Sequence, residues 1–283
     1  MNTKRILIWS VFALTMSLGS CTERYDIKLD DTNIRLVVDG IVSSDSIKHG
    51  VRLTTSTSYF FGEAPPAVSE AVVYLEDDNQ RRRLSEVDGK PGYYESQDAF
   101  AGQPGMNYKL EITLNQPIGE YDRYNAENRM PETSGIIDSI VLEYREPFDF
   151  YLLNLFAVDP PTVDFYKFDA FINGKIITDT ASRSLVVDDR FFNGNNTNGL
   201  GVMFIRGDEI KAGDTITLLL SAINEDYYSF FLELRTESGP SNPLFSGPPA
   251  NVRSNVKEGA LGYFAATRRA RASLIVPENP KGN

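Results

Sequence analysis

The sequence is poor in the residues that most often build reactive sites. It contains a single cysteine, Cys21, and a single histidine, His49. One cysteine excludes a disulfide within the chain, and one of each excludes a four-ligand Cys/His zinc site. A Ser-His-Asp arrangement would have to use His49, which lies in residues 46–50, where the sequence predicts a hairpin turn. We therefore expect neither a catalytic histidine nor an enzyme of that class.

Positive charge and long apolar runs are also scarce. The formal net charge is −11, and an acidic protein repels phosphate backbones, so we expect no nucleic-acid partner. The arginine clusters at residues 81–83 and 268–271 predict solvated strand faces or hairpins. Beyond residue 18, no apolar run approaches the roughly 20 residues that a membrane-spanning helix needs.

The first 21 residues carry a secretory signal. Lys4 and Arg5 precede an apolar run over residues 6–18, which is too short to span a bilayer as a helix. Leu18, Gly19 and Ser20 then precede Cys21, the pattern of a bacterial lipoprotein signal. We predict that residues 1–20 are removed and that Cys21 is acylated. An ordinary signal peptide with an incidental cysteine is the alternative.

The lipid anchor and its tether would attach the mature protein to a membrane. Several acyl chains on Cys21 would bind the lipid bilayer stably, where one chain would not. Residues 21–33 are polar and charged, which predicts a short tether. Glu23 and Asp26 are compatible with a signal for export to the cell surface.

Residues 34–120 predict an N-terminal β-sandwich. Tyr108, Leu110, Ile112 and Leu114 alternate with polar residues, the period of a half-buried strand, and turn signals separate several such segments. This pattern resembles small Ig-like or transthyretin-like sandwiches. Residues 121–135 show no consistent period, and we predict a linker there.

Residues 136–283 predict a larger C-terminal β-sandwich domain with one covering helix. The helix is expected near residues 225–236, with Asn224 as its N-cap. Its apolar residues recur at helical spacing and indicate a side packed on the core rather than a ligand platform. These are Tyr227, Phe230, Phe231 and Leu234. The fold class is therefore mainly β throughout.

A series of short segments, in order, carries a family resemblance. The segments are LVVDG (36–40), AVVYL (71–75), GYY (92–94), IDSI (137–140), DDRFFNG (188–194), GDT (213–215), YYSF (227–230), SNV (254–256) and GALGYF (259–264). The chain resembles the Bacteroidota lipoproteins grouped as domain of unknown function 4249. This resemblance implies an outer-membrane lipoprotein partnered with a TonB-dependent receptor β-barrel. It implies no catalytic residues.

One loop offers candidate metal ligands. Asp188, Asp189 and Asn193 lie close together in the sequence and carry the oxygen atoms that calcium prefers. Their spacing does not match an EF-hand loop. The favoured interpretation is a turn held by Asx hydrogen bonds, with Phe191 or Phe192 in the core. Calcium is the alternative, and we expect no other cofactor.

Two aromatic segments are candidates for ligand binding. Tyr59, Phe60 and Phe61 form one segment. Phe148, Phe150 and Tyr151 form the other. Both are expected in loops or at strand ends, where rings can stack on sugars or contact a protein. Packing in the core is an equal alternative for each.

These features favour a non-enzymatic lipoprotein in the outer membrane, lipid-anchored and facing the cell exterior. We expect an accessory subunit of a TonB-dependent outer-membrane transport complex. The alternative is a stand-alone lipoprotein that binds a glycan, a peptide or a metal complex. An enzyme using two carboxylates is a third hypothesis, but no pair among the 39 acidic residues stands out.

Overall fold

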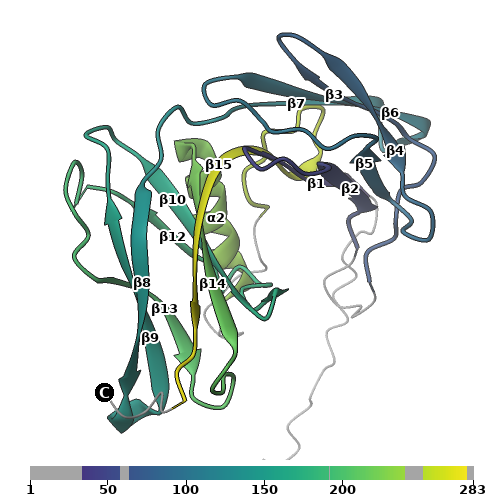
Figure 1. Cartoon of the computed structure of the whole chain (residues 1–283). Helices are drawn as coiled ribbons and strands as arrows, with labels where there is room; N and C mark the ends of the chain where they lie inside the picture. The colour runs from purple at the N-terminus through teal and green to yellow at the C-terminus, as the bar shows by residue number, and fades with distance from the viewer. Residues whose placement is uncertain (1–33, 58–63, 191, 240–250, 279–283) are drawn as a thin grey trace, which may run out of the picture. The chain divides into compact units, whose positions relative to one another are not determined.

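The structure is a computed structural model that describes residues 34–57, 64–190, 192–239 and 251–278. In these residues the fold is mainly β with a sandwich-like arrangement, which confirms the predicted class (Figure 1). The predicted signal at 1–20, the tether at 21–33 with Cys21, and Tyr59, Phe60 and Phe61 lie outside the described residues.

A twelve-stranded sheet runs through both predicted domains. Its path is β11-β10-β14-β15-β1-β2-β5-β4-β3-β6-β7, and β12 pairs with β10. The strands from the first half of the chain are β1 (Leu36–Ser43), β2 (Gly50–Thr55), β3 (Val72–Asp77), β4 (Arg81–Glu86), β5 (Tyr93–Ser96), β6 (Asn107–Ile118) and β7 (Tyr121–Arg129). Those from the second half are β10 (Phe165–Ile172), β11 (Lys175–Ile176), β12 (Leu185–Asp188), β14 (Thr215–Ile223) and β15 (Leu261–Ile275).

The two halves of the chain meet where β1 pairs with β15 in parallel. Val38 lies opposite Gly262 in this register. Gly262 has a φ of +85°, and a Cβ atom there would lie 2.0 Å from the Val38 carbonyl oxygen. Only glycine fits this position, because it combines a left-handed backbone with a close approach of two main chains. The N-terminal core is completed by Val256 and Phe264, so it depends on the C-terminal part.

The range predicted as a linker, 121–135, contains strand β7 over Tyr121–Arg129, and the prediction is wrong for those residues. Tyr124 and Ala126 are buried at alternate positions of β7, as in any half-buried strand. Asn128 takes the next inward position. Because it is polar, the alternation of apolar and polar residues that marks a strand is interrupted there. Its Oδ1 accepts a hydrogen bond from the backbone N–H of Ala266 (3.1 Å), so its burial is satisfied.

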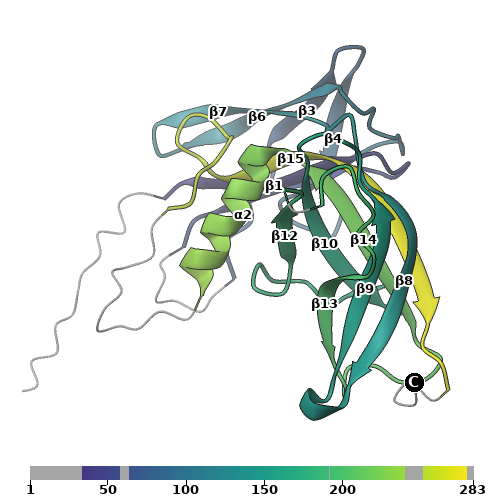
Figure 2. The ribbon, with the colours of Figure 1, turned by 90° about the vertical axis from the view of Figure 1, so that its left-hand side faces the viewer.

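A separate three-stranded sheet has the order β13-β9-β8. Its strands are β8 (Ile136–Arg145), β9 (Phe150–Val158) and β13 (Leu200–Arg206), and a 3-10 turn, η1 (Glu146–Phe148), joins β8 to β9. Residues from β9 and β13 share one hydrophobic core with residues from β10 and β14. Figure 2 shows the layers: the three-stranded sheet lies on one side of β10 and β14, and helix α2 lies on the other.

Helix α2 covers Glu225–Ser238, as predicted. The Asn224 side chain accepts a hydrogen bond from the backbone N–H of Tyr227 (3.0 Å), which satisfies one of the free donors at the helix start. Tyr227, Phe230 and Phe231 are buried against Tyr263 of β15, so the aromatic side is core. No helix in the described ranges is both long and apolar enough to cross a membrane.

Candidate functional sites

Two of the three predicted calcium ligands, Asp188 and Asp189, have different partners in the structure, and the third, Asn193, donates its backbone N–H to the Asp189 carbonyl oxygen (2.8 Å). The Asp188 carboxylate accepts hydrogen bonds from Arg190 Nε (2.8 Å) and Nη2 (2.6 Å). These bonds hold the pKa of Asp188 below its ordinary value. The backbone N–H of Arg190 also donates to Asp188 Oδ1 (3.3 Å), and Phe192 packs on the core. The predicted Asx turn is therefore confirmed around Asp188.

Asp189 instead meets two aspartates that the sequence did not single out. One carboxylate oxygen from each of Asp159, Asp164 and Asp189 lies within 4.8 Å of the other two, and all three residues are buried. We call this group the aspartate cluster. Asp159 follows β9, Asp164 precedes β10, and Asp189 follows β12. The register of β10 with β12, Phe165 opposite Asp188, brings two of these strand ends together.

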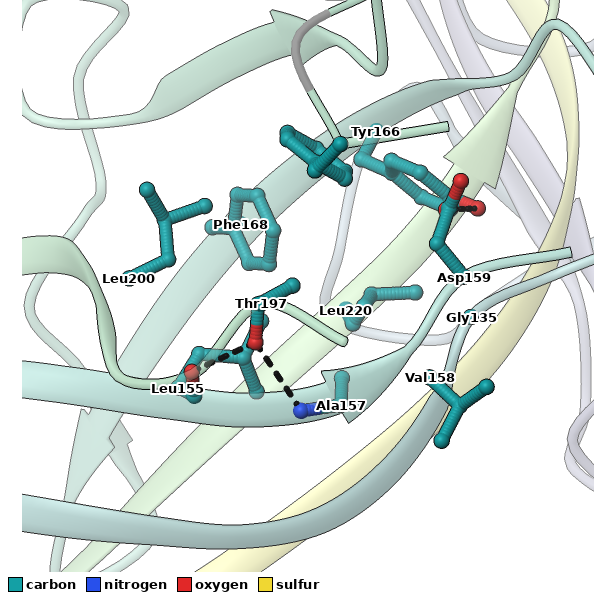
Figure 3. A pocket seen from close by; sticks show the side chains of 11 residues that line it. Gly135, Leu155, Ala157, Val158, Asp159, Tyr166, Phe168, Thr197, Leu200 and Leu220 are labelled. Atoms are coloured by element: carbon teal, nitrogen blue, oxygen red, sulfur yellow. Dashed lines mark hydrogen bonds between the residues drawn. The ribbon is translucent and has the colours of Figure 1, made fainter. Parts of the chain in front are cut away.

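Neutral donors hold the cluster in place. Asp159 accepts from the Tyr166 hydroxyl (2.7 Å) and from the backbone N–H of Gly194 (3.2 Å). Gly194 has a φ of +72°, a left-handed conformation that glycine adopts without strain. Figure 3 shows the Tyr166 hydroxyl beside the Asp159 carboxylate.

Asp164 and Asp189 are held in a similar way. Asp164 accepts from the hydroxyls of Thr133 (2.7 Å) and Thr162 (2.6 Å). Its own backbone N–H donates to Asp189 Oδ2 (2.9 Å). These bonds fix the orientation of all three carboxylates, and every donor among them is uncharged.

The electrostatics of the cluster are unfavourable. Burial raises the pKa of Asp159 and of Asp189, and the neighbouring carboxylates raise both further. Burial and the hydrogen bond to Asp159 also raise the pKa of Tyr166. Asp189 Oδ1 is buried and has no hydrogen-bond partner among the described residues. The cluster thus brings three acidic groups together away from water, and the described residues supply no cationic side chain that pairs with them.

A small cavity lies beside Asp159 and Tyr166 (Figure 3). Its volume is about 10 Å³, and most of its lining is apolar, including Leu155, Phe168 and Leu220. This volume is close to the minimum for a single water molecule. An organic ligand therefore does not fit in this cavity.

The second candidate region is a surface groove at one end of the three-stranded sheet. It has a volume of about 540 Å³ and is lined by Phe148, Asp149, Phe150, Phe204, Arg206 and Asp208. We call it the aromatic groove. The rings of Phe148 and Phe150 stack with centroids 5.8 Å apart, and Phe204 meets Phe150 edge to face at 5.1 Å. Phe148 is 74% exposed and Phe204 68%.

Two of the three predicted aromatic residues of this segment lie in the aromatic groove. Tyr151 does not, because successive residues of a strand point to opposite faces. It is 1% exposed and belongs to the core between the sheets, so its predicted role in ligand binding is wrong. Phe204 was missed. It lies in β13, far from Phe148 in sequence, and only the pairing of β13 with β9 places it opposite Leu152 beside the groove.

The groove also carries charge. Arg206 forms hydrogen bonds with both carboxylate oxygens of Asp208, at 3.0 and 2.8 Å. Asp149 Oδ1 accepts from the Tyr144 hydroxyl at 2.8 Å. Aromatic rings next to fixed polar groups can contact a protein or a glycan.

His49 is built into the N-terminal core. It is 2% exposed, its Nε2 lies 2.9 Å from the Phe100 carbonyl oxygen, and its ring contacts the Phe100 ring edge to face. Burial lowers its pKa. These contacts give His49 a packing role and keep it from solvent.

Comparison with known families gives one finding. A family model described as "Domain of unknown function (DUF4249)" matches residues 22–273. A search of curated proteins finds no match to this sequence.

Proposed function

The chain belongs to the DUF4249 family, and from this premise we propose that it is a non-enzymatic accessory subunit of a TonB-dependent outer-membrane transport complex. The partner is a TonB-dependent receptor β-barrel, as the family resemblance implies. The chain would help to capture cargo at the barrel or to stabilise the barrel's closed or open state.

Anchoring to the outer membrane is part of the same proposal. Lys4, Arg5 and the apolar run over 6–18 support secretion, and the residues before Cys21 support acylation. Glu23 and Asp26 support a surface-facing position. Acyl chains on Cys21 would keep the protein beside its barrel and raise the local concentration of each for the other.

The aromatic groove is the observation that carries the docking role. Phe148 and Phe204 are large and exposed, and both rings contact the Phe150 ring that lies between them. Clustered exposed aromatic rings with a polar rim are typical of protein contact sites, because the rings lose much water-accessible area on binding. Arg206 and Asp208 supply such a rim.

The non-enzymatic part of the proposal rests on how the reactive groups are placed. His49 is buried against Phe100. Among the described residues, the cavity beside Asp159 of the aspartate cluster has a volume of about 10 Å³, which is too small for an organic substrate.

The test is an affinity purification of the full, lipidated chain in mild detergent, with mass spectrometry of the proteins that co-purify. We expect a TonB-dependent barrel in near-equal amount. The double variant Phe148→Ala/Phe204→Ala should lower the amount of barrel at least about tenfold, since central aromatic residues dominate contact energies. Tyr121→Ala is the matched control, because Tyr121 is also exposed (45%) but lies in β7.

Recovery of the lipoprotein alone would contradict a stable complex. Recovery of equal amounts of barrel with the double variant and with wild type would contradict docking through the aromatic groove.

A stand-alone ligand-binding lipoprotein is the second candidate, and one feature of the aromatic groove favours it. Stacked rings beside the Arg206–Asp208 ion pair suit a glycan. In that case soluble glycans would raise the Tm of the full chain without any barrel, and Phe148→Ala would abolish the rise.

A further inference from the structure

The aspartate cluster lacks the partner that buried carboxylates require. Asp159, Asp164 and Asp189 are 4%, 7% and 0% exposed. Buried ionised groups persist when they are paired with an opposite charge or bind a metal. In the described residues, the charges that act most strongly on Asp159 and Asp189 are those of other aspartates.

One atom of the cluster shows the missing partner directly. Asp189 Oδ2 is held by the backbone N–H of Asp164, itself a member of the cluster, which turns the Asp189 carboxylate toward its neighbours. Asp189 Oδ1 is then left buried with no donor in the part of the chain that the structure describes. Unsatisfied buried polar atoms are rare in folded proteins and often indicate an ion or a water molecule.

The spacing of the oxygens suits a metal ion that binds oxygen. The three carboxylate oxygens of the cluster all lie within 4.8 Å of one another. Calcium binds oxygen at about 2.3–2.6 Å in a flexible geometry, so a calcium ion can contact all three with small movements of the protein. Magnesium demands a near-ideal octahedron at about 2.0–2.1 Å and usually keeps several bound waters, so a buried site of three carboxylates suits it less well.

The surrounding donors leave the carboxylates able to bind an ion. Each carboxylate oxygen has two lone pairs. The four carboxylate oxygens of Asp159 and Asp164 each accept one of the hydrogen bonds described above, so each keeps a lone pair for an ion. Partners of this kind orient metal ligands and are part of most metal sites. Pro161, Thr162 and Val163, between Asp159 and Asp164, are exposed. The cluster therefore lies close to the surface, and an ion has a short path to it from solvent.

We propose that Asp159, Asp164 and Asp189 bind one calcium ion, which fastens the three-stranded sheet to the twelve-stranded sheet. Asp159 directly follows β9 of the first sheet, whereas Asp164 precedes β10 and Asp189 follows β12 of the second. The ion would add a link between strand ends that otherwise meet through neutral hydrogen bonds. The site is separate from the aromatic groove and does not depend on the proposed transport role.

The experiment is thermal unfolding of the full chain in detergent, first freed of metal with EDTA and dialysed, then titrated with calcium chloride or magnesium chloride. We expect calcium to raise the Tm by about 5–10 °C at a concentration one hundredfold above its Kd. Magnesium at the same concentration should give less than half of that rise, because it demands near-ideal octahedral geometry and gives up its bound waters reluctantly.

Two variants make the test specific to the cluster. Asp189→Asn should abolish the response to calcium and, at the same time, raise the Tm of the metal-free protein. The rise follows because the substitution removes one buried charge and supplies an amide donor for the neighbouring carboxylates. If Asp189 had a purely structural role, the substitution would lower the Tm both with and without calcium. Asp78→Asn is the matched control: it makes the same chemical change at an exposed turn and should leave the calcium response intact.

The proposal is overturned if calcium leaves the Tm of wild type unchanged. It is also overturned if Asp189→Asn responds to calcium as wild type does. Should Asp189→Asn fail to fold by far-ultraviolet circular dichroism, the same comparison is made with Asp159→Asn, in which the amide oxygen can still accept from Tyr166.

Discussion

Two environments for buried aspartate lie close together in the C-terminal half of this protein. Asp169 of β10 is 6% exposed and forms an ion pair with Lys167, while the hydroxyls of Thr178 (2.9 Å) and Ser184 (3.1 Å) donate to its Oδ1. The aspartate cluster, at the start of the same strand, is equally buried. It has hydroxyl and backbone donors as well, but its members are paired with one another rather than with a cation.

The Asp169 site has a cation from its own chain that neutralises the buried carboxylate, whereas the aspartate cluster needs a cation from outside the chain. Lys167 brings a cation to Asp169 from the same strand, and its ammonium also lies over the Phe231 ring at 5.1 Å. The chain provides no such cation in the described surroundings of the cluster. Burial of a single carboxylate therefore says little about function. Burial of several carboxylates without a cationic side chain indicates a site that binds a cation.

The largest effect is expected where the Asp169 site is broken. Lys167→Met removes the cation and leaves Asp169 charged, so we expect a loss of about 3–5 kcal/mol in the free energy of unfolding. Urea denaturation of the metal-free protein measures this loss. Calcium should not restore it, because Lys167 neutralises a different carboxylate from those in the cluster.

The control for this prediction is the double variant Lys167→Met/Asp169→Asn, which removes both charges and should recover most of the lost stability. A loss below about 1 kcal/mol for Lys167→Met would show that Asp169 does not depend on its lysine, and the contrast between the two environments would disappear.

A smaller effect is expected from a residue that positions a ligand. Tyr166→Phe removes the hydroxyl that donates to Asp159 (2.7 Å) and keeps the ring in the core. Loss of such an outer partner lowers metal affinity by about 10–100-fold. Calorimetric titration of the full chain with calcium chloride measures the change. An unaltered Kd would mean that the hydroxyl does not orient the ligand.

The smallest effect is expected next to the cluster. Asp188→Asn breaks the pair with Arg190, whose side chain is 74% exposed, and pairs of this kind contribute at most about 1 kcal/mol. The rise in Tm with calcium should stay within about 1 °C of the wild-type rise. If the variant showed no rise in Tm with calcium, Asp188 would be a calcium ligand, as one interpretation of the sequence predicts.

Local features of the fold follow from the sequence, because local interactions produce them. The helix at Glu225–Ser238 is predicted by its Asn224 cap and by aromatic residues at helical spacing, and both are used in the structure. The alternation from Tyr108 to Leu114 likewise predicts β6, where these apolar residues are buried.

Pairing between distant segments does not follow in the same way. The register of β1 with β15 joins residues more than 200 positions apart, such as Val38 and Gly262. Strand β7 was not predicted, because one of its buried positions also depends on residues far away in the sequence. Asn128 is polar at an inward position, and Ala266, Asn224 and Tyr263 from distant segments satisfy its buried side chain with hydrogen bonds.

The candidate sites show the same limit. Phe148 and Phe150 are neighbours in sequence and lie together in the aromatic groove, but Phe204 joins them only through the β13–β9 pairing. Asp189 was singled out with Asp188, its neighbour along the chain. Its partners in space are Asp159 and Asp164, since the ends of β9, β10 and β12 converge from two sheets.

The stoichiometry of calcium binding tests the central distinction most directly. Equilibrium dialysis of the full chain in detergent, against calcium concentrations up to about 10 mM, reaches near-saturation for the affinities of about 0.1–1 mM that are typical of extracellular calcium sites. We predict one calcium ion per wild-type chain and none for Asp189→Asn, with Asp78→Asn equal to wild type. Equal binding by wild type and Asp189→Asn, or no binding by either, would contradict the assignment of the aspartate cluster as a cation site.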